Sequence, residues 1–229
     1  MDYRQVQRVA KDTISYIQDE LHPGMNLREV RELCERKMFD LGVDSFWYYN
    51  IGAFVFAGNE TAVSVSGREY VTSNRMIHEN DIVTIDLSPQ YGDIWGDYAR
   101  TIILENGIVV PSVDKISNTE WQDGLRMEER LHEELHHFAA PDTTFEQLYH
   151  HMNMFISMHG FVNLDFGGNL GHSIVKRKDD RVYIEKGNTR RLGDVDFFTF
   201  EPHIGRTAST YGYKMENIYS FSEGKLTEF

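Results

Sequence analysis

The chain alternates twice between a helical pair and a strand-rich segment, and this order limits the folds open to it. Apolar side chains recur at helical spacing in four segments, residues 3–21, 27–41, 117–139 and 144–158. Aromatic and β-branched residues with scattered glycines predict strands over residues 46–68, over residues 81–104 and from residue 161 onward. Since no Pro-, Gly- or Ser-rich linker separates the halves, we predict a single α+β domain, residues 1–229, with duplicated α-α-β-β halves and one continuous sheet.

Composition excludes several classes of protein. The formal net charge of −13 argues against a nucleic-acid footprint, which needs clustered Lys and Arg. Cys34 is the single cysteine, so neither a disulfide framework nor a cysteine-rich zinc module is expected. The amphipathic N-terminus lacks a signal-peptide core, and no apolar run approaches the roughly 18 residues of a membrane span. We therefore expect a cytoplasmic protein with no membrane partner.

The first predicted hairpin, residues 81–104, carries two carboxylates. Asp86 lies in the middle of the strand IVTIDLS, where propensity disfavours aspartate, and Asp97 lies on the partner strand. If the turn centres on Tyr91 and Gly92, the two residues are directly opposite one another. Opposed carboxylates repel unless a positive charge lies between them, so this hairpin suggests a cation site.

The same arrangement recurs near the C-terminus. Glu201 follows the apolar run FFTF, and Glu216 lies in YGYKMENIYSF. A turn centred on Ala208 and Ser209 would place the two glutamates opposite one another. Four buried carboxylates need compensation, because buried charges must be paired or must coordinate metal.

A fifth candidate ligand is His172, a Gly-flanked histidine in a strand-like context. Four carboxylates with one imidazole make an oxygen-rich donor set, which suits two divalent ions such as Mn²⁺, Co²⁺, Fe²⁺ or Zn²⁺. By contrast, HEELHH at residues 132–137 lacks the order of a zinc motif, and we assign its histidines to a solvated helix face.

These five residues, in this order, resemble the ligand pattern of the M24 metallopeptidases, which include methionine aminopeptidase, aminopeptidase P, prolidase and creatinase. The matching stretches are IDLSPQYGDIWGDYART, GH at 171–172, FEPHI at 200–204 and MEN at 215–217. The resemblance implies a pita-bread fold around a curved antiparallel sheet, without room for the extra N-terminal domain of the creatinase and prolidase branch. It also implies metal ligands at Asp86, Asp97, His172, Glu201 and Glu216.

The implied function is hydrolysis of an N-terminal amide bond by a metal-bridged water, with an aminopeptidase or Xaa-Pro-type preference. In this reading Glu201 is both a ligand and the acid–base that carries the proton to the leaving nitrogen. The expected partner is a short peptide or a small amide. The exposed-helix pattern and the acidic surface suggest a homodimer.

Two histidines that peptidases of this family usually carry near the scissile bond are missing. Ser66 stands before Gly67 at one place, and Asp179 lies near the other. Serine donates a hydrogen bond but cannot carry a proton as imidazole does near neutrality. His203, which shares the strand face of Glu201, is a candidate catalytic substitute.

The aromatic stretch SFWYYNIGAFVFAG corresponds to the family region that lines the pocket for the substrate's first side chain. Candidate substrate-binding residues are Phe54 and Phe56, with Ser66 nearby, and Trp47 and Tyr49 are further candidates. Arg100 and Thr101, just after Asp97, could orient the carboxylates, although a salt-bridged strand arginine explains Arg100 equally well.

Two alternatives stay open. The missing histidines favour a hydrolase of a small non-peptide amide or similar C–N bond, by analogy of fold. A non-catalytic binding module on the same fold would typically have lost ligands, and this chain retains all five.

Overall fold

The computed structural model describes the whole chain, residues 1–229, and confirms the four predicted helices. They are α1 (Tyr3–Glu20), α2 (Leu27–Asp40), α3 (Thr119–Phe138) and α4 (Phe145–Met158). Their N-caps follow from short polar side chains that accept from the first helical turn. Asp2, Asn26 and Thr144 each take part in a reciprocal capping box.

The strands are mostly short. They are β1 (Ser45–Phe46), β2 (Ala53–Ala57), β3 (Asp81–Leu87), β4 (Pro89–Tyr91), β5 (Ile94–Trp95), β6 (Tyr98–Glu105), β7 (Ile108–Val109), β8 (Phe161–Asn163), β9 (Ser173–Ile174), β10 (Phe197–Phe200), β11 (His203–Arg206), β12 (Tyr213–Lys214), β13 (Asn217–Ser222) and β14 (Lys225–Glu228). Four 3-10 turns complete the chain, namely η1 (Gly58–Ala62), η2 (Val113–Lys115), η3 (Lys178–Asp180) and η4 (Leu192–Asp194).

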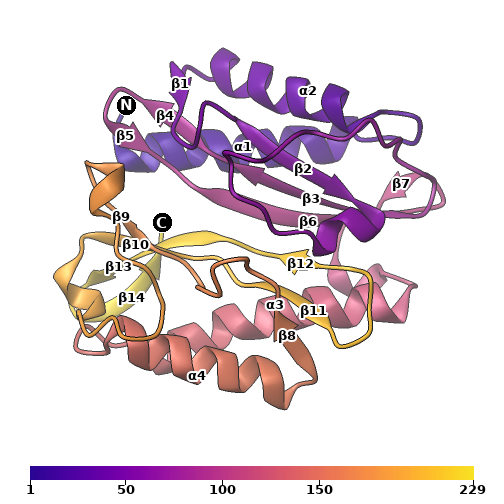
Figure 1. Cartoon of the computed structure of the whole chain (residues 1–229). Coiled ribbons are helices and arrows are strands. Elements are labelled where there is room, and N and C mark those ends of the chain that lie inside the picture. Colours follow the sequence, from indigo (N-terminus) through magenta and orange to yellow (C-terminus); the bar gives the residue numbers. More distant parts are fainter.

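The two halves are stacked with their strands facing each other (Figure 1). Helices α1 and α2 cover the outer face of β2, β3 and β6, while α3 and α4 cover the strands of the second half. Each half has its own apolar core, and the larger one joins the first helix pair to β2 and β3. The inner faces of the sheets meet between these cores, and the polar side chains gather there.

All strand pairings are antiparallel, as predicted, but the expected continuous sheet is interrupted. The strands form four hydrogen-bonded groups, in the orders β1-β4-β5, β2-β3-β6-β7, β14-β13-β10-β9 and β12-β11-β8. The halves are joined where β6 meets β12, since the Thr101 hydroxyl donates to the carbonyl oxygen of Lys214 and accepts from its amide. The hydrogen-bonded ladders are interrupted at Glu201, between β10 and β11, and at Glu216, between β12 and β13.

The register predicted for the first hairpin was wrong by two residues. Asp86 pairs with Ala99, not with Asp97, because the two-residue turn lies at Gly92 and Asp93. Gly92 has a φ of 58°, a left-handed conformation that glycine adopts without a Cβ penalty. Asp97 therefore precedes β6 and lies diagonally across from Asp86, still close enough for the side chains to approach.

The register predicted for the second hairpin is confirmed. His203 pairs with Lys214 and Phe200 with Asn217, so Glu201 and Glu216 occupy opposed positions at the break between the two ladders. The turn contains Ala208, which has a φ of 69°. This hairpin brings two carboxylates from either side of one turn to the same place.

Replacing Gly124 with Ala is expected to destabilise the protein, although alanine is the better helix former by about 1 kcal/mol. A Cβ at position 124 of α3 would lie 2.2 Å from the ring of Tyr213. That ring is fully buried, and its hydroxyl donates to the Glu120 carbonyl oxygen. Overpacking of this kind costs about 1–3 kcal/mol. Urea unfolding measures the change, and the double variant Gly124→Ala/Tyr213→Leu should recover stability; an unchanged midpoint in the single variant contradicts the packing.

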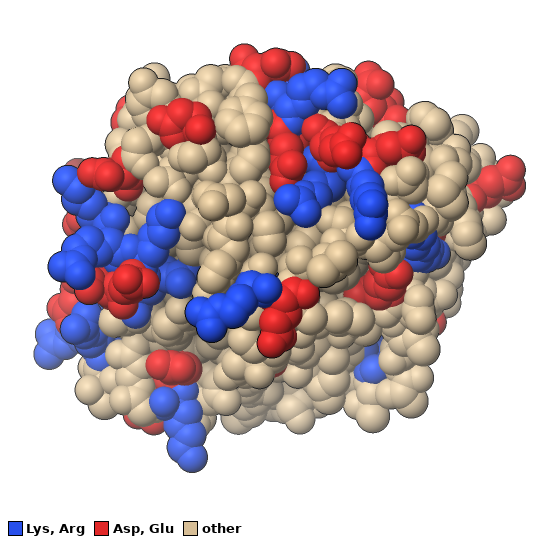
Figure 2. Space-filling model, turned by 45° about the horizontal axis from the view of Figure 1, so that its top comes forward, with Lys and Arg blue, Asp and Glu red and all other residues tan.

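None of the helices combines the length and hydropathy that a membrane span requires. On the face seen in Figure 2, basic side chains gather toward one edge, and acidic side chains lie among them. The overall charge of −13 is therefore not expressed as an area of one sign on this face.

Candidate metal centre

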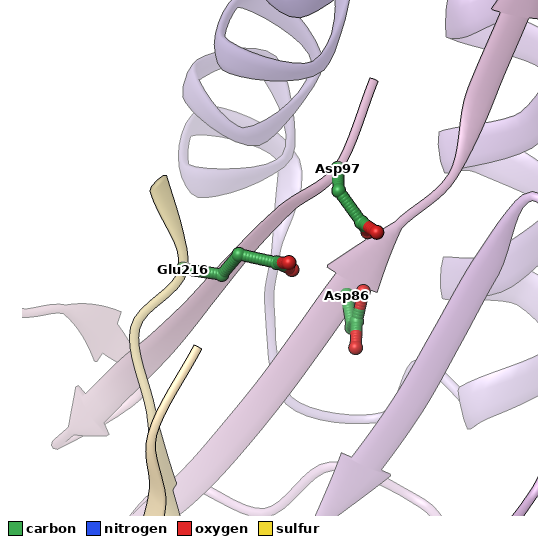
Figure 3. A group of neighbouring side chains, drawn as sticks. All are labelled: Asp86, Asp97 and Glu216. Carbon is green, nitrogen blue, oxygen red and sulfur yellow. The ribbon is translucent and has the colours of Figure 1, made fainter. Parts of the chain in front are cut away.

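Three carboxylates converge between the two halves. Asp86 comes from β3, Asp97 from the segment before β6, and Glu216 from the link between β12 and β13. One oxygen of each lies within 4.8 Å of the others, and Figure 3 shows the three side chains pointing toward one another. The diagonal pairing of the first hairpin thus still brings its two aspartates together.

The remaining two candidates complete the cluster. His172 Nε2 lies 3.5 Å from Asp97 Oδ2 and 3.6 Å from Glu201 Oε1. Asp86, Asp97, His172 and Glu201 line one cavity of about 160 Å³, whereas Glu216 is fully buried behind it. The structure therefore brings together all five residues that the sequence suggested as ligands.

The backbones that carry these candidate ligands are fixed by hydrogen bonds from buried or part-buried side chains. The Gln7 side chain, in α1, donates to the Asp97 carbonyl oxygen at 2.7 Å and accepts from the Asp97 amide at 3.1 Å. Arg100 donates to the carbonyl oxygen of Glu216 at 2.8 Å and to the side chain of Asn217 at 2.7 Å. Arg100 thus fixes the backbone of the segment that carries Glu216, and it makes no salt bridge, so the second role considered for it is wrong.

The cluster fits a divalent cation. Both carboxylate oxygens of Glu216 are buried without a hydrogen-bond partner, an arrangement that costs free energy unless a cation is coordinated. Burial and the neighbouring Asp97 raise the pKa of Glu216 well above its ordinary value. Burial raises the pKa of Asp97 to about 7. Carboxylate oxygens with one imidazole nitrogen are donors that Mn²⁺, Fe²⁺, Co²⁺ and Zn²⁺ accept.

A lysine that the sequence reasoning missed lies inside the cluster. Lys214 Nζ lies 2.5 Å from Asp86 Oδ2 and 3.0 Å from Glu201 Oε2. Burial alone would raise the pKa of Glu201, but Lys214 and then His172 outweigh it and hold the pKa below its usual range. Strand alternation could have found this residue, because Lys214 and Glu216 are two positions apart and share a face.

His203 lines the same cavity but is already engaged. Its Nε2 donates to the carbonyl oxygen of Thr61 at 2.7 Å, which leaves Nδ1 as the acceptor. Burial lowers the pKa of His203 to about 4, so the ring is neutral near pH 7. A catalytic role for His203 stays a prediction.

Phe54 and Phe56 both line the cavity, together with Trp47. Ser66 does not; its hydroxyl oxygen accepts from the Arg68 amide, and Ser64 and Val65 contribute to the lining instead. Tyr49 is 49% exposed and also lies outside the lining. Substrate contacts at these positions stay predictions.

The expectation that the histidines of α3 face solvent was wrong for His132. His132 is 7% exposed, and its ring nitrogens contact the Tyr219 hydroxyl at 2.6 Å and the Met215 carbonyl oxygen at 3.1 Å. Burial lowers its pKa to about 3. The helix turns this histidine toward β13, while His136 and His137 are exposed as expected.

Replacing Glu128 with Gln is expected to stabilise the protein more at pH 8 than at pH 5, by about 1 kcal/mol or more. Glu128 is 2% exposed, and neither carboxylate oxygen has a hydrogen-bond partner. Burial raises its pKa well above the ordinary value. Below about pH 4.5 the Glu128 carboxyl is protonated in both the folded and the unfolded protein and costs no stability. As the pH rises toward the folded-state pKa, only the unfolded protein loses this proton, so the free energy of unfolding falls.

Thermal unfolding of both proteins in EDTA at the two pH values measures this difference. Glu133→Gln, an exposed change on the same helix, is the control and should leave the pH dependence unaltered. Equal pH slopes for wild type and Glu128→Gln would contradict the burial argument.

Solved structures share the fold. An X-Pro aminopeptidase from Thermotoga maritima superposes with a TM-score of 0.77 at 20% identity, over 99% of this chain and 58% of that one. The prolidase from Pyrococcus furiosus gives 0.74 at 21%, over 99% and 61%. A methionine aminopeptidase from Thermotoga maritima gives 0.77 at 15%, over 99% and 94%. These similarities confirm the predicted pita-bread fold.

The chain spans 58% of the X-Pro aminopeptidase and 61% of the prolidase. No curated protein matches the chain significantly. The family model described as metallopeptidase family M24 matches residues 2–223, a range that contains all five converging side chains. On this match, the chain belongs to metallopeptidase family M24.

Proposed function

We propose that the protein is a divalent-metal-dependent hydrolase that cleaves the N-terminal amide bond of short peptides. The observation that carries the proposal is the convergence of Asp86, Asp97, His172, Glu201 and Glu216 at one cavity. Structural neighbours named as an X-Pro aminopeptidase, a prolidase and a methionine aminopeptidase support it.

The five side chains would hold two ions, of Mn²⁺, Co²⁺, Fe²⁺ or Zn²⁺. Bound there, the ions would supply Lewis acidity toward a carbonyl oxygen and toward water. The carboxylates of the chain would fix where the positive charge of these ions lies. The Gln7 and Arg100 contacts hold two of these carboxylates in place, which is the role of outer-shell residues in metal sites.

Glu201 is the residue that we propose to carry the proton. Its side chain is 19% exposed and faces the cavity, and its lowered pKa keeps it ionised near neutrality. An ionised carboxylate can accept a proton from water and return it to the leaving nitrogen. His203 would serve as a neutral hydrogen-bond acceptor through Nδ1, since its Nε2 is occupied by Thr61.

A peptide panel tests the proposal. Metal-free protein is loaded with each of Mn²⁺, Co²⁺, Fe²⁺ and Zn²⁺ and incubated with di-, tri- and tetrapeptides, half of them with proline second. We expect release of the N-terminal residue with at least one metal, and none in EDTA. Absence of release from every peptide with every metal would contradict it.

A second candidate is hydrolysis of a small non-peptide amide. It is favoured by the sequence, since Ser66 and the exposed Asp179, neither of which lines the cavity, stand where peptidases of the family usually carry histidines. N-acyl amino acids and amino acid amides, added to the same panel, decide between the two. Cleavage of these compounds alone would favour the second candidate.

Two further proposals follow from the composition, the exposed-helix pattern and the acidic surface. We propose a cytoplasmic location and a homodimer, and light scattering of the purified protein tests the latter. A mass near 26.7 kDa at all concentrations would contradict the dimer.

A further inference from the structure

The metal cavity has a smaller neighbour of about 40 Å³, and the two cavities share one lining residue, Lys214. One water molecule needs roughly 10–15 Å³ of such space, and an ammonium group is of similar size. The second cavity therefore has room for the end of a lysine side chain. Its other charged lining residues are Arg100, Glu128 and Glu129.

Glu128 lies in this second cavity without a counter-ion. It is 2% exposed, and neither of its carboxylate oxygens has a hydrogen-bond partner. Burial raises the pKa of Glu128 well above its ordinary value, and the charge of Lys214 is the largest effect in the opposite direction. A buried carboxylate needs a cation or hydrogen-bond donors in contact with it, so a partner for Glu128 has to come from the same cavity.

Two of the charged neighbours cannot provide this partner. Arg100 already donates to three acceptors, among them the Glu216 carbonyl oxygen at 2.8 Å and Asn217 Oδ1 at 2.7 Å. Glu129 is exposed and has the same sign as the buried acid. Among the charged side chains that line this cavity, Lys214 is thus the one that can pair with the acid.

The backbone of Lys214 is fixed, whereas its ammonium group is held only by candidate metal ligands. The Thr101 hydroxyl accepts from the Lys214 amide at 2.8 Å and donates to its carbonyl oxygen at 3.0 Å. Nζ lies 2.5 Å from Asp86 Oδ2 and 3.0 Å from Glu201 Oε2. Because the four-carbon stem of a lysine is flexible, Nζ can change from one cavity to the other while Cα stays in place.

Metal loading would remove the reason for the ammonium group to stay on these ligands. The candidate ligands include four carboxylates with four negative charges, and two divalent ions would bring four positive charges. The carboxylates and the ions then balance, and the ammonium group is an excess buried charge on oxygens that the ions also need. An ionised Glu128 would balance this excess charge.

We propose that Glu128 is the second counter-ion of Lys214, and that the ammonium group moves from Asp86 and Glu201 to Glu128 when the divalent ions bind. Glu128 is then a positioning residue, which contacts neither ion nor substrate and favours metal loading by accepting the ammonium group that the ions displace. The inference rests on the metal centre of the proposed function and adds to it a residue outside the ligand set.

Calorimetric titration of Mn²⁺ into metal-free wild type, Glu128→Gln and Glu129→Gln tests the proposal. Glu128→Gln should raise the Kd for Mn²⁺ by about tenfold or more, the size of a charge-assisted hydrogen bond. Glu129→Gln is the matched control, because it removes the same charge from an exposed position of the same cavity. It should change the Kd by less than about twofold, since solvent screens an exposed charge. Thermal unfolding in EDTA checks that each variant is folded.

The Lys214→Met background separates a moving ammonium group from a direct effect of the Glu128 charge on the ions. In this background Glu128→Gln should leave the Kd for Mn²⁺ unchanged, because no ammonium group has to be accepted. A rise in Kd of the same size in both backgrounds would show that Glu128 acts on the ions through space, and it would overturn the proposal.

A crystal structure of the Mn²⁺-loaded protein gives the second test. Lys214 Nζ should lie about 3 Å from a Glu128 oxygen, and an ammonium group still bonded to Asp86 and Glu201 would overturn the proposal. Neither test uses a substrate, so the result does not depend on whether peptides are cleaved. Equal Mn²⁺ affinity of wild type and Glu128→Gln overturns this inference alone, whereas a wild type that binds no Mn²⁺ overturns the metal centre with it.

Discussion

Replacing Asp97 with Asn is expected to lower kcat/KM by about a thousandfold or more, which corresponds to about 4 kcal/mol of transition-state stabilisation. Asp97 is 5% exposed, lies within 4.8 Å of Asp86 and Glu216 oxygens, and is 3.5 Å from His172 Nε2. It therefore lies next to three of the other four candidate ligands. An amide oxygen in its place carries no charge and binds a divalent cation far more weakly.

The same change is not expected to unfold the protein. Because the folded-state pKa of Asp97 is raised to about 7, its ionised form costs stability, and this cost grows as the pH rises from about 4 to 7. In EDTA at pH 8 the Asp97→Asn variant should thus be at least as stable as wild type. Retention of wild-type activity with Mn²⁺, measured on the best peptide of the panel, would contradict the assignment.

Replacing Lys214 with Met is expected to destabilise the metal-free protein by about 3 kcal/mol, the lower range for breaking a buried ion pair. At this chain length the loss corresponds to a fall in Tm of about 6–12 °C. The ammonium group neutralises Asp86 and Glu201, which are only 20% and 19% exposed, and Met removes the charge while keeping similar bulk. Saturating Mn²⁺ should abolish the difference, because bound cations then neutralise the same carboxylates.

Thermal unfolding with and without Mn²⁺ measures both effects. Lys115→Met is the control, because Lys115 is an exposed residue of η2 without a salt bridge. This change should leave the Tm unaltered both in EDTA and with Mn²⁺. If Lys214→Met is as stable as wild type in EDTA, the ammonium group does not offset the cost of burying Asp86 and Glu201, and the prediction is wrong.

The sequence could predict the helices and the pairing of Glu201 with Glu216 because both depend on local patterns. Apolar side chains at helical spacing defined the extents of α1 and α2 to within one residue. In the second hairpin a single turn connects the paired strands, so the register of Glu201 against Glu216 followed from the turn position. These features involve residues that are neighbours along the chain or across one turn.

The first hairpin shows where such reasoning fails. The short strands β4 and β5 place the turn at Gly92, and a shift of one residue in the turn moves every pair by two. Nothing in the local pattern distinguished this turn from one centred at Tyr91.

Long-range contacts were also beyond the sequence pattern. Alternation could place Lys214 on the face of Glu216 but not its contact with Asp86 from the other half of the chain. His132 is buried only because its helix turns that face toward Tyr219. Arg181 enters the cavity because its loop is tied to Trp47 by Lys178. Each of these depends on how the two halves pack together.

Calorimetric titration of Mn²⁺ into metal-free wild type and Asp97→Asn tests the central claim most directly. Wild type should bind two ions per chain, with a gain in Tm because an ion that binds only the folded state stabilises it. The Asp97→Asn variant should lose this binding. Absence of binding by wild type, or unchanged binding by the Asp97→Asn variant, would contradict a metal centre built from these five residues.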